Sequence, residues 1–198
     1  MSFQMKKILW LILSIPALGM IYGVMSGNAL SGDLLHPSGE FSTRFMIIAM
    51  IATPLNLIFR KCGWSLTVPK WLLRHRRAFG VAAFVYAILH TLFYLIDVGA
   101  LSTIMSDFIE IGIWTGWLAF LIFIPLGLTS NDASQRYLRS AWKKLQRWAY
   151  PAAVFTLLHW LFVHNNYGPA LVHFVPLAIL ELFRIYCVYS EKSRKSAK

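Results

Sequence analysis

Long apolar segments separated by short basic loops dominate this chain of 198 residues. A helix needs about 20 predominantly apolar residues to cross a bilayer, because unpaired backbone groups are too costly in hydrocarbon. Six segments approach that length, namely residues 8–25, 43–59, 78–98, 112–128, 148–164 and 169–189. The second contains Pro54, and its helix is expected to begin earlier, near Ser38 as the N-cap. The sequence therefore predicts an all-α membrane protein, a six-transmembrane-helix bundle forming a single domain over residues 1–198.

The composition supports lipid as the solvent of this chain. Hydrophobic residues make up 58% of the sequence and charged residues only 14%, against about 25% charged in soluble domains. The net charge of +11 would suit a nucleic-acid-binding protein. However, the Lys and Arg residues are divided among loops between apolar segments, which favours the lipid bilayer as partner and excludes nucleic acid.

The distribution of basic residues also predicts an orientation. All of the 19 Lys and Arg residues except Arg44 and Arg184 precede the first span, follow the last, or lie in the loops at 60–77 and 136–147. These four regions share one side of a six-span bundle. Because an excess of Lys and Arg marks the cytoplasmic side, both termini are predicted to be cytoplasmic.

Two histidines lie inside predicted spans at matching depth. His90 is 12 residues beyond Ala78, and His159 is 11 residues beyond Trp148, in spans that run in the same direction. At 1.5 Å per residue, both imidazoles lie roughly 17–18 Å from the cytoplasmic edge. Haem iron takes axial histidine ligands, and helical bundles hold cofactors between facing helices. The pair predicts a haem whose iron is bound by His90 and His159.

The residues around these histidines are compatible with two interpretations. Small or aromatic residues share a helical face with each histidine: Gly80, Ala83 and Ala87 with His90, and Ala152, Phe155 and Thr156 with His159. Such faces leave room for a flat ring, and they also suit ordinary helix packing. The alternative is that each histidine hydrogen-bonds a neighbouring helix and binds no cofactor.

Arg44 is the only basic residue on the predicted outer side, where His36, His164 and His173 also fall. A haem carries anionic propionates, so Arg44 is a candidate cofactor-binding residue. The alternative is a side chain that extends to lipid headgroups. His75 lies in a basic cytoplasmic loop and is expected to be solvated.

Several short motifs follow one another in a specific order along the chain. They are residues 36–39 (HPSG), 53–55 (TPL), the Arg76–Arg77 pair with Gly80, His90, residues 125–130 (PLGLTS), residues 142–145 (WKKL) with Tyr150, and His159. Together they cover most of the chain. This arrangement resembles the MsrQ family, also called YedZ, the haem-binding membrane subunits of bacterial methionine sulfoxide reductase systems within the ferric-reductase-like transmembrane group.

The resemblance implies a b-type haem, with His90 and His159 at the family's ligand positions, in the bacterial inner membrane. It implies an electron-transfer subunit rather than a complete enzyme. Electrons would pass from the cytoplasmic side, from a flavin reductase or the quinone pool, to a periplasmic molybdenum-containing methionine sulfoxide reductase. FMN also has a role in the family, and no residue of this sequence places it.

One position departs from the family pattern. MsrQ-like sequences usually carry a further histidine 13 residues before the histidine of span five, and here that position is Gln146. Thirteen residues correspond to roughly 19–20 Å of helix, enough for a second haem near the other leaflet. Glutamine is not an expected haem ligand, so the sequence predicts one haem.

Two other functions remain open at the level of sequence. The same fold could act as a stand-alone ferric or quinone reductase. A metal or proton transporter or an assembly scaffold is a third hypothesis, but transporters usually place acidic residues near the midplane. Here Asp97 lies at the edge of a span, and Glu181 lies toward the cytoplasmic half of the last span.

Overall fold

The computed structural model describes residues 3–164 and 167–196, and helices account for nearly all of them. The described elements are α1 (Phe3–Met25), the short 3-10 helix η1 (Gly32–Leu34), α2 (Leu35–Lys61), α3 (Thr67–Val98), α4 (Leu101–Asp107), α5 (Ile111–Leu128), α6 (Asp132–Leu138), α7 (Ser140–Gln146), α8 (Ala149–His164) and α9 (Tyr167–Ser196). No β-strand occurs in these two ranges. The predicted all-α class is confirmed.

Five helical segments are long and apolar enough to cross a membrane: Lys6–Met25, Gly32–Lys61, Thr67–Val98, Ile111–Leu128 and Tyr167–Glu191. The chain is therefore a multi-pass membrane protein. The predicted span at 148–164 coincides with α8, which has 16 residues and falls short of the ~20 that a full crossing needs. The sixth crossing stays a prediction. The expected N-cap at Ser38 is wrong, because α2 begins at Leu35, directly after η1.

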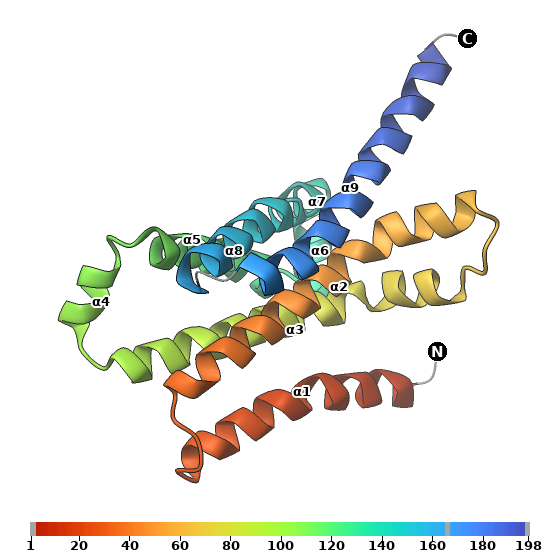
Figure 1. Cartoon of the computed structure of the whole chain (residues 1–198). Coiled ribbons are helices and arrows are strands. Elements are labelled where there is room, and N and C mark those ends of the chain that lie inside the picture. The colour runs from red at the N-terminus through yellow and green to blue at the C-terminus, as the bar shows by residue number, and fades with distance from the viewer. Residues whose placement is uncertain (1–2, 165–166, 197–198) are drawn as a thin grey trace.

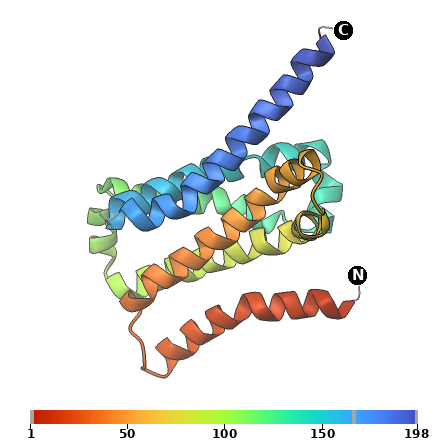
Figure 2. The ribbon, with the colours of Figure 1, turned by 45° about the vertical axis from the view of Figure 1, so that its right-hand side comes forward.

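Four helices form two antiparallel pairs, and α9 packs against both pairs. α2 packs along most of α3, α5 packs along α8, and α9 lies against α2 and α8. Figures 1 and 2 show α9 extending beyond the bundle at its C-terminal end, while α1 lies apart and approaches only one side. Both termini lie toward the end that carries α6 and α7, and α4 lies at the opposite end.

Small and aromatic side chains fill the interior between these pairs. The main cluster of buried residues combines alanines, which let helices approach closely, with bulky side chains such as Phe84 and Phe123. Phe84 of α3 lies directly against Gly127 of α5, where any Cβ would collide with the phenyl ring. The α3–α5 interface is therefore closely packed at the C-terminal end of α5.

On the predicted cytoplasmic side, one ion pair fixes the loop after α5. The Arg77 guanidinium contacts the Asp132 carboxylate and donates to Gln135 Oε1 at 2.7 Å. The hydrogen bond from Arg77 and its positive charge lower the pKa of Asp132. These contacts attach α6 to the start of the membrane-embedded part of α3.

Tyr86 completes the backbone hydrogen bonding of α1, which contains Pro16. In a regular helix the Ala17 N–H would donate to the Leu13 carbonyl. Here the Tyr86 hydroxyl lies between them, accepting from Ala17 N–H at 2.8 Å and donating to Leu13 O at 2.9 Å. Tyr86 is only 1% exposed. Lipid offers no replacement partner for the Ala17 N–H and the Leu13 carbonyl next to Pro16. The Tyr86 hydroxyl therefore provides their hydrogen bonds and joins α1 to α3.

Replacing Tyr86 with phenylalanine is therefore expected to destabilise the protein. The change leaves one buried N–H and one carbonyl without the bridging hydroxyl, at a cost of about 1–3 kcal/mol. Thermal unfolding in detergent measures the effect. Tyr22→Phe is the matched control, because Tyr22 lies on α1 itself and is 70% exposed. Equal stability of the two variants would contradict the proposed bridge.

Candidate functional site

The two intramembrane histidines face each other across the bundle. His90 projects from α3 and His159 from α8, and their ring centres lie 5.9 Å apart with the ring planes at 79°. A metal bound by one nitrogen of each ring, with bonds of about 2.0 Å, would place the ring centres about 6 Å apart. The structure thus brings together the two residues that the depth argument paired.

Backbone carbonyls determine which nitrogen of each imidazole carries the proton. His90 Nδ1 lies 2.9 Å from the Leu35 carbonyl oxygen, and His159 Nδ1 lies 2.7 Å from the Gly112 carbonyl oxygen. A carbonyl oxygen can only accept, so Nδ1 carries the hydrogen in both neutral rings. The Nε2 lone pair is then the one suited to a metal, in the arrangement typical of metal-bound histidines.

A cavity of about 880 Å³, including its open mouth, lies between the two helix pairs. Its wall comes from α2, α3, α5 and α8, and it includes His90, His159, Ala87, Tyr94, Trp117, Phe120, Phe123, Thr156 and Trp160. A mostly apolar, aromatic wall with two convergent imidazoles suits a planar metal macrocycle. Two of the predicted face residues, Ala87 and Thr156, are part of it.

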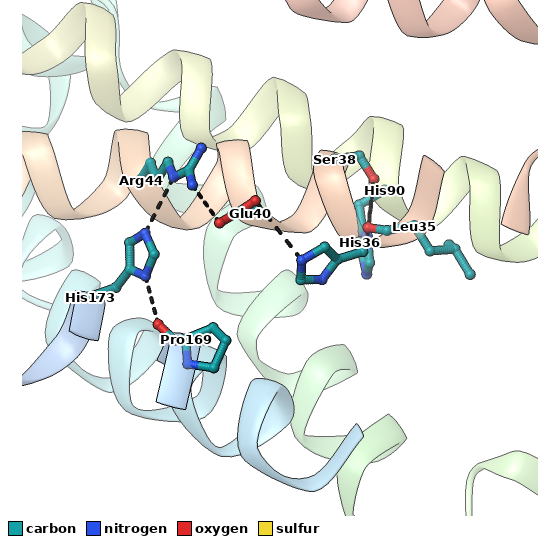
Figure 3. A network of polar contacts seen from close by, with 8 residues as sticks. All are labelled: Leu35, His36, Ser38, Glu40, Arg44, His90, Pro169 and His173. Atoms are coloured by element: carbon teal, nitrogen blue, oxygen red, sulfur yellow. Dashed lines mark hydrogen bonds and ion pairs between the residues drawn. The ribbon is translucent and has the colours of Figure 1, made fainter. Parts of the chain in front are cut away.

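A chain of polar contacts runs from His36 and Glu40 on the cavity wall to Arg44 and His173 (Figure 3). Arg44 lies 2.5 Å from Glu40 Oε1 and donates from Nε to His173 Nε2 at 3.3 Å. Glu40 in turn lies 4.0 Å from His36 Nε2. The wall, as far as the structure describes it, includes His36 and Glu40 but not Arg44. Arg44 therefore stands beside the mouth, attached to a carboxylate of the wall.

The remaining predicted polar residues have separate surroundings. His75 is only 5% exposed, so the expectation that it is solvated is wrong. Its ring packs on Trp71 at 4.4 Å, and its Nδ1 lies 2.8 Å from the Trp71 carbonyl, because helix α3 extends back through the basic loop. The side chain of His164 lies outside the part of the chain that the structure describes.

Gln146 has a backbone partner at the end of α5. Its amide nitrogen lies 3.3 Å from the Leu126 carbonyl and 3.4 Å from the Thr129 hydroxyl. The last carbonyls of a helix need such donors. Gln146 thus joins α7 to the C-terminal turn of α5.

Four residues lie around the imidazoles whose place there the sequence analysis did not predict. Gly39 lies against the His90 ring and Gly116 against the His159 ring. Ser38 and Thr115, which are almost completely buried, precede these glycines. The sequence does contain one signal, since a Ser-Gly and a Thr-Gly dipeptide each lie near the start of a long apolar helix.

Comparisons with known proteins identify relatives of this chain. A family described as "Ferric reductase like transmembrane component" matches residues 38–157, which include His90 and end two residues before His159. The haem-binding subunit MsrQ of the protein-methionine-sulfoxide reductase of Azospira oryzae is 30% identical over 91% of this chain and 78% of its own length. The subunits of the same name from Brucella ovis and Brucella canis are each 31% identical over 96% of this chain and 86% of their own.

The chain belongs to the MsrQ family. The predicted resemblance is thereby confirmed. No solved structure matches the chain. MsrQ relatives align with it across nearly all of its helices, so the paired histidines lie inside the shared region.

Proposed function

We propose that this protein is a haem b-binding transmembrane subunit that passes electrons from the cytoplasmic side or the quinone pool to a periplasmic methionine sulfoxide reductase. The observation that carries the proposal is the pair of imidazoles, 5.9 Å apart, on the wall of a mostly apolar cavity. The MsrQ relatives are named as haem-binding subunits of such a reductase. His90 and His159 are the proposed axial ligands.

The proposed topology has six crossings in the bacterial inner membrane, with both termini in the cytoplasm. The alternating direction of α1, α2, α3, α5, α8 and α9 supports it. The basic loops all lie toward one end of these helices, as the positive-inside rule requires. α8 would span a locally thin region, helped by its neighbours in the bundle.

The chain's own residues suit electron transfer rather than bond-making chemistry. A bound haem would supply reversible one-electron chemistry at its iron. If His90 and His159 both held the iron, it would keep no open site for a substrate. The carbonyls of Leu35 and Gly112 hold the imidazoles in the metal-binding tautomer, and the cavity wall is mostly apolar and aromatic. Arg44 is proposed to contact an anionic group of the cofactor from beside the cavity, in competition with its own ion pair to Glu40.

His90→Ala and His159→Ala should each abolish the Soret band and the reducible α-band of the purified protein, because each removes one axial bond to the iron. Absorption spectra and haem quantification measure this. His75→Ala is the control, because His75 is buried on the same helix as His90, 15 residues away. Normal haem content in both ligand variants would reject the assignment.

The second prediction concerns stoichiometry. One haem per chain is expected, and Gln146→His should leave that number unchanged. Gln146 closes the end of α5, and Phe84 packs directly against Gly127 near that end, where a second ring would need space. Pyridine haemochrome assays against protein concentration measure the ratio. A ratio of two in either protein would show that the inner site exists.

The identity of the acceptor separates this function from a stand-alone ferric or quinone reductase of the same fold. The chain produced together with its genomic neighbours should co-purify with a molybdenum-containing sulfoxide reductase. Its dithionite-reduced haem should be reoxidised by that reductase only when methionine sulfoxide is present. Fast reoxidation by ferric chelates or quinones alone, with no effect of the reductase, would favour the alternative. FMN remains a possible cofactor by family resemblance alone, and we assign no residue to it.

A further inference from the structure

Two helices at the candidate site repeat the same three-residue arrangement. On α2, the Leu35 carbonyl accepts from His90 Nδ1 at 2.9 Å and from the Ser38 hydroxyl at 3.0 Å, and Gly39 lies next in the chain. We call Leu35, Ser38 and Gly39 the α2 cradle. Ser38 Oγ also lies 3.2 Å from His90 Nδ1.

The α5 cradle consists of Gly112, Thr115 and Gly116. The Gly112 carbonyl accepts from His159 Nδ1 at 2.7 Å, and the Thr115 hydroxyl lies 2.9 Å from this carbonyl and 2.7 Å from the Ile111 carbonyl, between which its hydrogen is shared. The spacing is the same in both cradles: a carbonyl, a hydroxyl three residues later, and a glycine four residues later. Residues four apart in a helix lie one above the other, so each glycine stands directly beside its carbonyl.

The glycines are needed because the imidazoles lie on the helix backbone. A Cβ on Gly116 would lie 2.6 Å from His159 Nδ1, and a Cβ on Gly39 would lie 3.2 Å from His90 Nδ1 and Cε1. The first distance is impossible without movement of the ring, and the second requires a shift of a few tenths of an ångström. Any larger residue would push the ring away from the carbonyl that holds its proton.

We infer that Gly39 and Gly116 are positioning residues that fix the rotation of the two imidazoles. The Ser38 and Thr115 hydroxyls contact the same two carbonyls that accept from the histidines. The inference rests on the proposed haem function. Each cradle contacts a ring through its Nδ1 hydrogen and through the glycine beside Nδ1 and Cε1, so α2 and α5 determine the 79° angle between the rings. The Nδ1–H bond also raises the basicity of the ligand, which stabilises oxidised iron.

The test compares Gly116→Ala and Gly39→Ala with Gly80→Ala in the haem-loaded, full-length protein. An added Cβ at Gly80 meets nothing within 4 Å, so this variant controls for the helix-stabilising effect of alanine. Gly116→Ala should lower haem affinity about 10–100-fold. It should also move the reduction potential to a more positive value and change the low-spin EPR signal that reports the angle between axial rings. Gly39→Ala should change the same quantities less, and Gly80→Ala not at all.

Identical potentials and EPR spectra in the wild type, Gly116→Ala and Gly39→Ala proteins would overturn the inference, as would an equal effect of Gly80→Ala. Should Gly116→Ala fail to fold, the milder Gly39→Ala decides on the same readouts.

A haem-independent measurement separates this inference from the proposed function. Nitrogen NMR of histidine-labelled, haem-free protein should show the Nδ1–H tautomer for His90 and His159, lost or exchange-broadened for His159 in Gly116→Ala. Absence of haem from the wild type, with these signals present, would reject the proposed function and leave the cradles intact. The Nε2–H tautomer in the wild type would reject the cradles.

Discussion

A polar group in hydrocarbon must find its partner inside the protein, and the interior of this bundle follows from that requirement. Tyr86 supplies the hydrogen bonds that the Pro16 kink takes from α1. The same requirement directs His90 and His159 to backbone carbonyls on neighbouring helices rather than to water. Each of these bonds joins two helices, so the contacts that satisfy polar groups also determine how the helices are arranged.

The site depends on both antiparallel pairs at once. α2 holds the His90 ring of its partner α3, and α5 holds the His159 ring of its partner α8. The cavity lies between the two pairs, and both imidazoles form part of its wall. Toward the end that carries α6 and α7, the pairs close on each other through Phe84 and Gly127. The bundle is therefore hollowed beside the two histidines and closely packed at the contact between Phe84 and Gly127.

Hydropathy and spacing predicted the helical class and the pairing of His90 with His159, because both depend on distances along one helix axis. The cradles could not be predicted, since they depend on which face of α2 meets α3 and which face of α5 meets α8. The solvated state expected for His75 was wrong for a related reason. A basic loop was inferred from charge alone, whereas α3 continues through it and buries the imidazole beside Trp71.

Arg44 shows how far charge can be assigned from sequence. The sequence singled it out as the only basic residue of the predicted outer side, and the structure shows its guanidinium shared between Glu40 and His173. Glu40 lies on the cavity wall, so the net charge that the Arg44–Glu40 pair offers to an incoming anion is close to zero. Burying an uncompensated carboxylate is costly. A cofactor with two carboxylates in this cavity would therefore need water, or a cation other than Arg44, beside at least one of them.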